Sequence, residues 1–456
     1  MREYTEEDIK RFEHIIDTHD REAALAELSE LHPADIAELY QKLDLSQAEW
    51  LFGLLDEETA ADVLMELDED DRLKLISEMP AEKIAQQIAP LATDDAVDLI
   101  QQLDEDEREE ILSHIDDVEQ AGDIIDLLKY AEDTAGGLMG TEMIVVNENW
   151  SMPECIKQMR LQAEDMDEIY YVYVVDNDYR LRGTLPLKMM LTHPSVSKIK
   201  HVMEADPVSV KVDTPIDDVA LDFEKYDLVA MPVVDSIGRL LGRITVDDVM
   251  DQVRESSERD YQLASGISSD VDADDSVLAQ TKARIPWLLI GIGSGLLASV
   301  ILGTFEAQLQ AVTALALFIP IIGGTGGNVG VQASAIVVQG LANGSLDIKH
   351  FASQLGKEVL IGLLNATVIT AVVLVYNLLT MPTDLAVTLS VAVSLFVVVM
   401  FASLLGTVVP LTLEKLHINP ALATGPFIQI SNDIVGLIIY VQISTFFLRH
   451  MTNVAI

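Results

Sequence analysis

An aspartate near the end of the sequence stands in the middle of a long apolar segment. Fifteen uncharged residues, 418–432, precede Asp433, and fifteen more, 434–448, follow it. A helix of that length crosses about 30 Å of hydrocarbon, which would place the carboxylate near the centre of a bilayer. A charge there costs about 3 kcal/mol or more unless it faces water, a partner or a cation. We therefore expect a carboxylate that attracts cations, in preference to a structural aspartate that is hydrogen-bonded or protonated.

The helical face that carries Asp433 is expected to line a pore. Helical spacing adds four small or polar residues to this face: Pro426, Gln429, Gly436 and Tyr440. Pro426 has no N–H group, so in a continuous helix it would leave the carbonyl of Leu422 free to bind water or an ion.

A glycine-rich apolar segment at 318–340 supplies the second group of candidates. Its sequence, FIPIIGGTGGNVGVQASAIVVQG, permits close helix approach and places Asn328, Gln332 and Gln339 on one face. These amides either pack between helices or receive a hydrated ion beside Asp433. Neutral oxygens with few carboxylates suit a hard cation that keeps its waters, above all Mg²⁺, and no cluster of His, Cys or Met near Asp433 favours a soft metal.

The charge of the chain is concentrated ahead of these segments. The sequence has 75 acidic and 29 basic residues, and 69 of the acidic and 23 of the basic residues precede Lys282. Such acidity excludes nucleic acid as the main partner. The start, MREYTEEDIKRF, is too charged for a secretory signal, and the single Cys155 cannot form an internal disulfide. We therefore expect an acidic cytoplasmic half joined to a membrane half.

The membrane half contains five apolar runs long enough to cross a bilayer as helices. They fall at about 285–305, 309–338, 359–381, 385–413 and 418–448. If the N-terminus is cytoplasmic, five basic residues lie inside and Arg449 alone lies outside; the five are Lys282, Arg284, Lys349, Lys357 and Lys415. We expect a multi-pass protein of the plasma or inner membrane, in contact with lipid, with its C-terminus outside.

The acidic half begins with a 12-residue repeat. Apolar residues recur at Leu31, Leu43, Leu55, Leu67, Met79, Leu91, Leu103 and Ile115. Each unit has room for one short helix and its turn, which predicts an all-α superhelix. Its acidic surface is either a solvated or salt-adapted surface or a weak sensor of divalent cations.

A second repeat, with a spacing of 59, predicts two tandem α/β modules. Val175-Asp176, Arg180-Leu181 and Gly183 return as Val234-Asp235, Arg239-Leu240 and Gly242. The second copy resembles a CBS domain, and some CBS domains hold a nucleotide ribose with the residues that match Thr245 and Asp248. The first copy has Pro186 and Met189 at those places, so bound ATP is the less favoured interpretation. After Asp251 a polar stretch can form a helix that connects the modules to the membrane.

Taken together, these motifs resemble the MgtE family of magnesium channels over nearly the whole chain. They are Asp133-Thr134-Ala135-Gly136, PVVD, TVDD, Arg284-Ile285-Pro286-Trp287, GGNVGVQ and NPALATGPFIQISNDIVG. The resemblance implies a superhelix at 1–130, CBS domains at 137–198 and 199–254, a plug-like connecting helix at 255–281 and a five-helix pore domain at 282–456.

The resemblance also implies a function. We expect a Mg²⁺-selective channel-type transporter for uptake, built as a homodimer in which two copies of Asp433 face one hydrated Mg²⁺. Cytosolic Mg²⁺ would bind between the acidic domains and close the pore. The positions that match the family's regulatory residues are Asp227, Asp248, Asp251 and Asp260; Asp94 and Asp95 are added because the repeat places them together at a helix start. The expected pore residues are Asp433, Asn419, Gln429, Asn328 and Gln332.

The sequence departs from the family pattern at four positions. Asn419 replaces an aspartate at the cytoplasmic mouth, Gln339 replaces an arginine, and Ser256 and Arg259 replace acids in the connecting helix. We therefore expect a weaker response to cytosolic Mg²⁺ than in typical relatives.

Other functions fit parts of the pattern. The same architecture could carry Co²⁺, Ni²⁺ or Mn²⁺, or the chain could be a non-transporting sensor whose CBS pair binds a nucleotide. An anion channel is disfavoured because Asp433 repels anions. An enzyme is disfavoured because the sequence has no Ser/His/Asp arrangement, no P-loop and no metal-binding Cys/His spacing.

Overall fold

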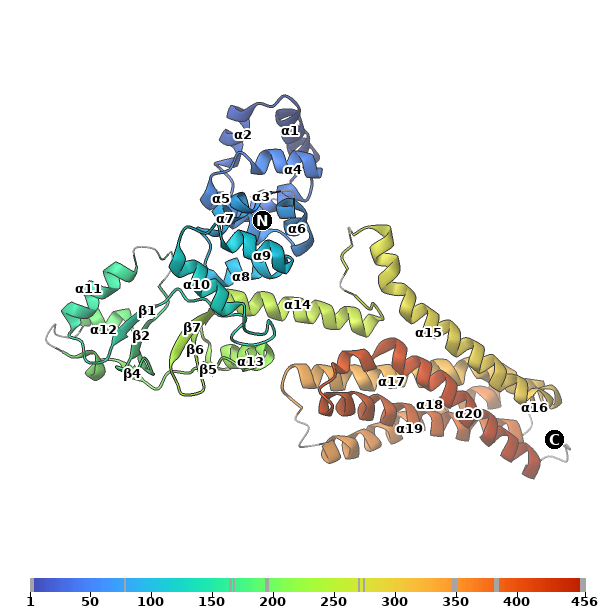
Figure 1. The fold of residues 1–456 in the computed structure, drawn as a ribbon. Coiled ribbons are helices and arrows are strands. Elements are labelled where there is room, and N and C mark those ends of the chain that lie inside the picture. The colour runs from blue at the N-terminus through green and yellow to red at the C-terminus, as the bar shows by residue number, and fades with distance from the viewer. Residues whose placement is uncertain are drawn as a thin grey trace. The chain divides into compact units, whose positions relative to one another are not determined.

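A computed structural model describes residues 4–77, 79–163, 166, 169–192, 197–269, 271–273, 275–346, 351–380 and 385–451. The chain divides into two compact units, Met1–Gln252 and Val253–Ile456. Short helices and two β-sheets form the first unit, and long helices form the second (Figure 1).

The first unit begins with short helices that follow the predicted 12-residue period. After α1 (Glu6–Asp17) come α2 (Arg21–Leu28), α3 (Pro33–Tyr40), α4 (Leu45–Phe52), α5 (Glu57–Glu66), α6 (Glu69–Ser77), α7 (Ala81–Ile88), α8 (Thr93–Gln101), α9 (Glu105–Leu112) and α10 (Val118–Leu127). Asp44 and Asp56 cap two of these helices by accepting the backbone N–H groups of Gln47 and Thr59, both at 3.0 Å. One apolar position of each repeat is buried between neighbouring helices, as at Leu64, Ile88 and Ile100. The repeat therefore forms a helical stack, as the sequence predicts.

Two small sheets follow. The first, in the order β1-β2-β3-β4, consists of β1 (Ile144–Asn147), β2 (Val172–Val175), β3 (Leu181–Leu185) and β4 (Glu204–Ala205), with α11 (Met152–Gln162), α12 (Leu187–Thr192) and η1 (Ile199–His201). The second, in the order β5-β6-β7, consists of β5 (Val210–Lys211), β6 (Ala230–Val234) and β7 (Leu240–Thr245), with α13 (Ile216–Tyr226). In each sheet a parallel pair precedes an antiparallel hairpin, at β1-β2-β3 and β5-β6-β7.

The two hairpins show that these modules are copies of one unit. Each has a register shift at the equivalent place, between Val174 and Val175 and between Val233 and Val234. The hairpins also bond to each other, because Leu181 donates its N–H to Gly238 and Leu240 donates to Tyr179, both at 3.0 Å. The doubled α/β module that the 59-residue spacing predicts is thus confirmed.

The segment before β1 pairs with the second module. Ala135 and Gly136 donate backbone hydrogen bonds to Thr214 and Val212, at 2.8 and 2.9 Å. Gly136 is required here, because a Cβ atom at that position would lie 2.6 Å from the Val212 side chain. This pairing fixes the start of the first module against the second.

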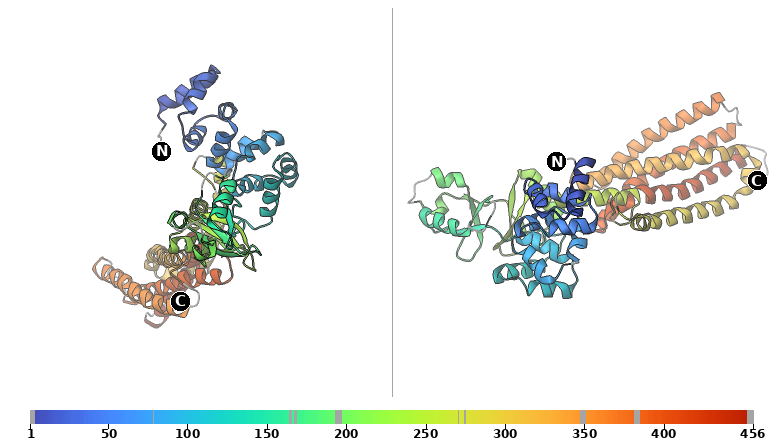
Figure 2. Two further views of the ribbon diagram at one scale, coloured as in Figure 1. Left: turned by 90° about the vertical axis from the view of Figure 1, so that its left-hand side faces the viewer. Right: turned by 90° about the horizontal axis from the view of Figure 1, so that it is seen from above.

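Helix α14 (Val246–Ser265) leads into the second unit. The long helices there are α15 (Val277–Thr304), α17 (Ile319–Ala342), α18 (Phe351–Thr380), α19 (Leu385–Lys415) and α20 (Gly425–Met451), joined in part by α16 (Glu306–Ala311), η2 (Thr313–Phe318) and η4 (Pro420–Ala423). Among the described residues, five helical segments are long and apolar enough to cross a membrane, which confirms the predicted five spans. Helices α17, α18, α19 and α20 pack together, and α15 contacts α20 (Figures 1 and 2).

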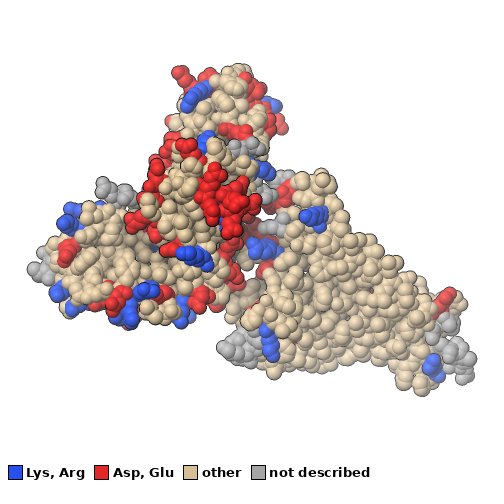
Figure 3. Space-filling model, viewed as in Figure 1, with Lys and Arg blue, Asp and Glu red and all other residues tan. Residues whose placement is uncertain are grey.

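The helices of this unit differ in how much they bury. Helix α19 packs against α17, α18 and α20 and has the most buried apolar stretch, whereas the most apolar stretch of α15 is not buried within the described part of the chain. Charge is also distributed unevenly. Acidic side chains gather on the N-terminal helices, while the visible face of the long helices is nearly uncharged (Figure 3). Lys349, which contributed to the predicted orientation, lies outside the described residues.

Candidate ion pathway and regulatory cluster

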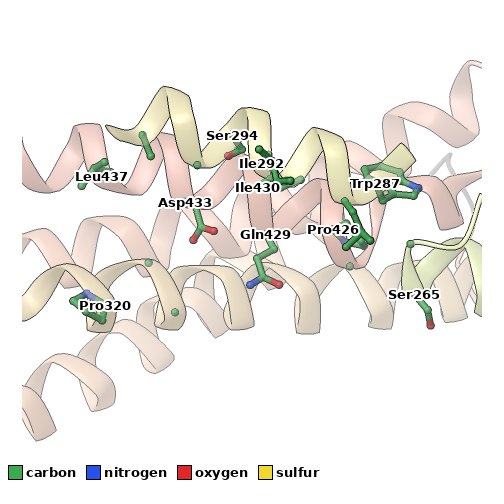
Figure 4. A pocket seen from close by; sticks show the side chains of 18 of the residues that line it. Ser265, Trp287, Ile292, Ser294, Pro320, Pro426, Gln429, Ile430, Asp433 and Leu437 are labelled. Carbon is green, nitrogen blue, oxygen red and sulfur yellow. The ribbon is translucent and has the colours of Figure 1, made fainter. Parts of the chain in front are cut away.

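Asp433 lies in a groove of about 1300 Å³ formed by α15, α17, α20, the end of α14 and the residues just after it. Gln429 and Pro426, one and two turns before Asp433 on α20, line the same groove. The side chains of Asp433 and Gln429 point into one space (Figure 4). The structure therefore brings together three of the residues that the sequence placed on a pore-lining face.

The glycines of α17 make this groove possible. A Cβ atom at Gly323 would lie 3.2 Å from Oδ1 of Asp433, and one at Gly327 would lie 3.3 Å from Cγ of Gln429. Larger residues would push α17 away from α20, so the glycines serve close helix approach, as predicted.

Asn432 ties α20 to α17 and was not singled out in the sequence. Its side chain is 1% exposed, and its Nδ2 donates to the carbonyl oxygen of Gly326 at 3.3 Å. A Cβ atom at Gly330 would clash with the same amide. Because adjacent helical residues point about 100° apart, Asn432 facing α17 leaves Asp433 facing the groove. The sequence features that could have predicted this contact are the amide next to Asp433 and the glycines spaced four residues apart in α17.

Two residues of the predicted pore face are instead buried inside the helix bundle. The hydroxyl of Tyr440 donates to the carbonyl of Leu315 at 2.7 Å, and Gly436 packs against Val398 of α19. Helical spacing predicts the direction in which a residue points, but it does not predict which neighbouring helix lies on that side. Here α19 covers the side of α20 that carries Gly436 and Tyr440.

The predicted interruption by Pro426 is also corrected. Helix α20 begins at Gly425, so Pro426 lies in its first turn, where a missing N–H group breaks no intrahelical bond. Leu422 lies before the helix, in η4, and its carbonyl is not freed by the proline.

The predicted amides of α17 lie elsewhere. Asn328, Gln332 and Gln339 are exposed on this helix, and neither Asn328 nor Gln332 is among the described residues that line the groove. Gly324, one turn before Asn328 on the same face, does line it. Their role at an ion path stays a prediction.

Asn419 and Asp260 contact each other directly. The Nδ2 atom of Asn419, just before η4, donates to Oδ1 of Asp260 on α14 at 2.8 Å. Asn419 is exposed and lies outside the lining of the groove among the described residues. The structure thus joins a predicted pore residue to a predicted regulatory residue.

A cluster of carboxylates lies in the first unit, where α8 meets the second CBS module. Burial, together with the Asp248, Asp95 and Glu142 carboxylates, raises the pKa of Asp94 well above its usual range. Burial, with Asp248 beside it, likewise raises the pKa of Asp95 to about 6. The predicted residues Asp94, Asp95 and Asp248 are therefore neighbours.

Polar contacts hold α8 in this place. The N–H group of Thr93 donates to Oε1 of Glu142 at 2.9 Å, and the N–H of Thr141 donates to the Thr93 hydroxyl at 2.9 Å. Thr245 donates from its hydroxyl and, at 3.3 Å, from its N–H to Oδ2 of Asp248. Burial raises the pKa of Asp248, and the Thr245 hydroxyl opposes this shift.

Asp227 and Asp251 are further predicted regulatory residues of the first unit. Asp227 ends α13 in a left-handed conformation with φ of 52°, and Asp251 is exposed on α14. Within the described parts of the chain, no three Asp, Glu, His or Cys side chains converge on one position that could hold a metal. Metal binding at these residues stays a prediction.

A buried carboxylate in the second unit was not predicted from the sequence. Glu358 on α18 is 7% exposed and accepts a hydrogen bond from the hydroxyl of Ser403 on α19. Its position beside Lys357, at the start of an apolar run, resembles an ordinary charged flank.

Comparison with known proteins shows which family combines a helical N-terminal domain, two CBS modules and a membrane-spanning unit. The profile of the MgtE family, described as a divalent cation transporter, matches residues 319–443, the MgtE intracellular N domain matches 31–133, and CBS domains match 135–194 and 199–255. The magnesium transporter MgtE of Thermus thermophilus is 36% identical over 335 residues, which cover 71% of this chain and 72% of that protein. The chain belongs to the MgtE family. The Enterococcus faecalis magnesium transporter MgtE is 31% identical over 73% of each chain.

Membership of the MgtE family agrees with the fold. A crystal structure of the cytosolic domain of the Mg²⁺ channel MgtE in complex with ATP is similar to 54% of this chain, with 30% identity and a TM-score of 0.51, and 99% of that structure is covered. With five candidate spans, this chain is a multi-pass membrane protein of a transporter family, which is not an enzyme class.

Proposed function

We propose that this chain is a channel-type transporter for Mg²⁺ uptake, whose ion path passes Asp433. The observation that carries the proposal is the position of this carboxylate: it lies at mid-span in a groove, in a chain 36% identical to a magnesium transporter. A charge in the membrane needs water or a cation, and the groove gives access to both.

The groove suits an ion that keeps its hydration shell. Asp433 supplies the charge, and Gln429 supplies neutral polar atoms one turn away. A fully dehydrated cation would require more direct ligands, whereas Mg²⁺ gives up its waters reluctantly. The carboxylate and amide would bind those waters instead of the metal.

The working form in this proposal is a homodimer with a cytoplasmic N-terminus. The exposed amides Asn328, Gln332 and Gln339 lie on an apolar spanning helix, where contact with lipid is unfavourable. A second copy of α17 against this face would cover the amides and bring two copies of Asp433 to one path.

The carboxylate cluster supports the proposed regulation by cytosolic Mg²⁺. Asp94, Asp95 and Asp248 repel one another when ionised, so Mg²⁺ bound among them favours α8 docked on the second CBS module. That docked state would close the pore. ATP is a second candidate ligand of this unit, since a relative's cytosolic domain was crystallised with ATP, and Thr245 and Asp248 are the residues expected to hold it.

Flux measurements test the transport proposal. Purified wild type and Asp433→Ala would be reconstituted in liposomes at equal density, with a folding check, and Mg²⁺ entry measured. We expect entry with wild type and none with the variant. Equal entry through both would reject the path past Asp433, and no entry through either would favour the nucleotide-binding sensor.

Selectivity among metals needs a second measurement. A site that recognises a hydrated ion discriminates imperfectly, so Co²⁺, Ni²⁺ and Mn²⁺ should be tested as competitors of Mg²⁺. We expect Mg²⁺ to be carried in preference; faster entry of one of the others would identify that metal as the substrate.

A further inference from the structure

A single amide links the end of α14 to the segment that begins α20. Nδ2 of Asn419 donates to Oδ1 of Asp260 at 2.8 Å, while Oδ1 of Asn419 accepts the N–H group of Ala421, also at 2.8 Å. Because Ala421 holds the amide oxygen, the orientation of the amide is fixed and its N–H group faces Asp260.

Close backbone packing surrounds this hydrogen bond. A Cβ atom at Gly425 would clash with the carbonyl oxygen of Ala264. Gly266, which has φ of 82°, lies so near Pro426 that a Cβ atom would be 2.5 Å from the proline ring and 3.6 Å from Trp287. Two glycines therefore allow the end of α14 to dock on the first turn of α20, and Asn419 supplies a polar tie for it.

The chemistry of this contact leaves no place for a cation between the two side chains. A metal ligand must direct an oxygen lone pair at the metal, but the oxygen of Asn419 is used by Ala421 and its N–H group faces Asp260. A cation there would meet the positive end of the N–H dipole. A hydrogen bond from an amide to a carboxylate also stabilises the contact without a metal, because one partner is charged.

We propose that Asn419 holds α14 against the start of α20 by a metal-independent hydrogen bond to Asp260, so that this contact persists without Mg²⁺. The contact itself does not rest on the proposed function. Both residues were expected from the sequence to bind metal; here each is the other's partner. Bound Mg²⁺ would then act through other residues.

Hydrogen exchange of the full-length protein in detergent tests this proposal with Mg²⁺ alone as the probe. Amide exchange in 253–266 would be compared in EDTA and in Mg²⁺ for wild type, Asn419→Asp, Asp260→Asn and the double variant. We expect wild type to be equally protected in both solutions. Asn419→Asp places a second carboxylate opposite Asp260, and the two repel each other. Amide exchange of 253–266 in this variant should therefore rise about tenfold in EDTA and return toward the wild-type rate with Mg²⁺.

The double variant reverses the roles of the two side chains. An amide on α14 can donate to a carboxylate at 419, so protection should again be independent of Mg²⁺. Glu258→Gln, which removes an exposed charge from the same helix, is the matched control and should behave as wild type. Unchanged exchange in α19 shows that each variant is folded.

Two results would overturn the proposal. One is wild-type protection that disappears in EDTA, and the other is Asn419→Asp protection that never depends on Mg²⁺. Because the measurement records opening of α14 and not ion flux, it remains decisive if the transported ion proves to be another metal or if nothing is transported.

Discussion

Aspartates occur in opposite arrangements in the two units of this chain. In Met1–Gln252, Asp94, Asp95 and Asp248 lie together, and burial, with repulsion from neighbouring carboxylates, raises their pKa values. In Val253–Ile456, Asp433 lies in a groove whose other described lining residues include no acidic side chain. Under the proposed function, the same functional group would serve two purposes, depending on how many copies share a site.

The difference has a simple electrostatic basis. Clustered carboxylates repel one another until a proton or cation neutralises them, so under the proposed function the cluster would report the concentration of that cation. One carboxylate per chain, which would bind the waters of a divalent cation and not the metal itself, would hold that cation weakly. Weak binding of this kind allows the ion to leave, which conduction requires.

Removal of the isolated carboxylate should have the largest effect. We expect Asp433→Asn to lower Mg²⁺ flux into proteoliposomes by about 100-fold or more, because a unit charge at 4 Å contributes about 4 kcal/mol at an effective dielectric of 20. Glu414→Gln removes an equal charge from the same unit and should leave the flux near wild type. Equal loss in both variants would mean that overall charge, and not position, matters.

Neutralising the cluster should have the next largest effect, on regulation. The variant Asp94→Asn, Asp95→Asn, Asp248→Asn lacks the repulsion that Mg²⁺ relieves. Cleavage of the full-length protein by a protease in EDTA should slow about tenfold for the N-terminal helices, and Mg²⁺ should add little. If wild type and variant are cleaved alike in EDTA, the three carboxylates do not control docking of α8.

Because α17 lies close to Asp433, a small substitution on α17 should change the selectivity among ions, with a smaller effect than the two variants above. In Gly323→Ala the added Cβ atom would lie 3.2 Å from Oδ1 of Asp433, so the carboxylate must shift by a few tenths of an ångström. We expect the ratio of Mg²⁺ to Ca²⁺ flux to change about threefold, since the site depends on the spacing of the two helices. Gly293→Ala on α15, where a Cβ atom meets nothing within 4 Å, is the control. Similar ratios in both variants would contradict the proposed geometry.

The raised pKa values predict a modest dependence on pH. The pKa of Asp95 is about 6 in the folded chain, against about 4 when unfolded. The folded state therefore holds the proton more tightly, so docking of α8 is most stable below about pH 4 and is weakened as pH rises through about 6. Without Mg²⁺, proteolysis of the N-terminal helices should be faster at pH 7.5 than at pH 5. Mg²⁺ should protect mainly at the higher pH, and protection of equal size at both would refute this role.

The sequence predicts the architecture well because the fold is periodic. The 12-residue repeat, the 59-residue repeat and the five apolar runs each leave a regular pattern, and Asp433 is conspicuous as a charge within one of those runs. Contacts between distant segments leave no such pattern. The approach of Asp248 to Asp94, and of Asn419 to Asp260, depends on how helices dock.

The errors in the predicted pore face have the same origin. Spacing along α20 groups Tyr440 and Gly436 with Asp433, but the packing of α19 decides which of them reach the groove. Asn432 was overlooked because the role of an amide in an apolar helix depends on its partner, here the carbonyl of Gly326.

Single-channel recording in inside-out patches can separate the two proposed roles in one experiment. Wild type, the triple cluster variant and Asp433→Glu would be exposed to increasing Mg²⁺ on the cytosolic side. We expect the triple variant to keep the wild-type unitary current but lose its dependence on cytosolic Mg²⁺, and Asp433→Glu to change the unitary current while keeping that dependence. A triple variant with altered unitary current and an intact response to cytosolic Mg²⁺ would contradict the division of roles between the two units.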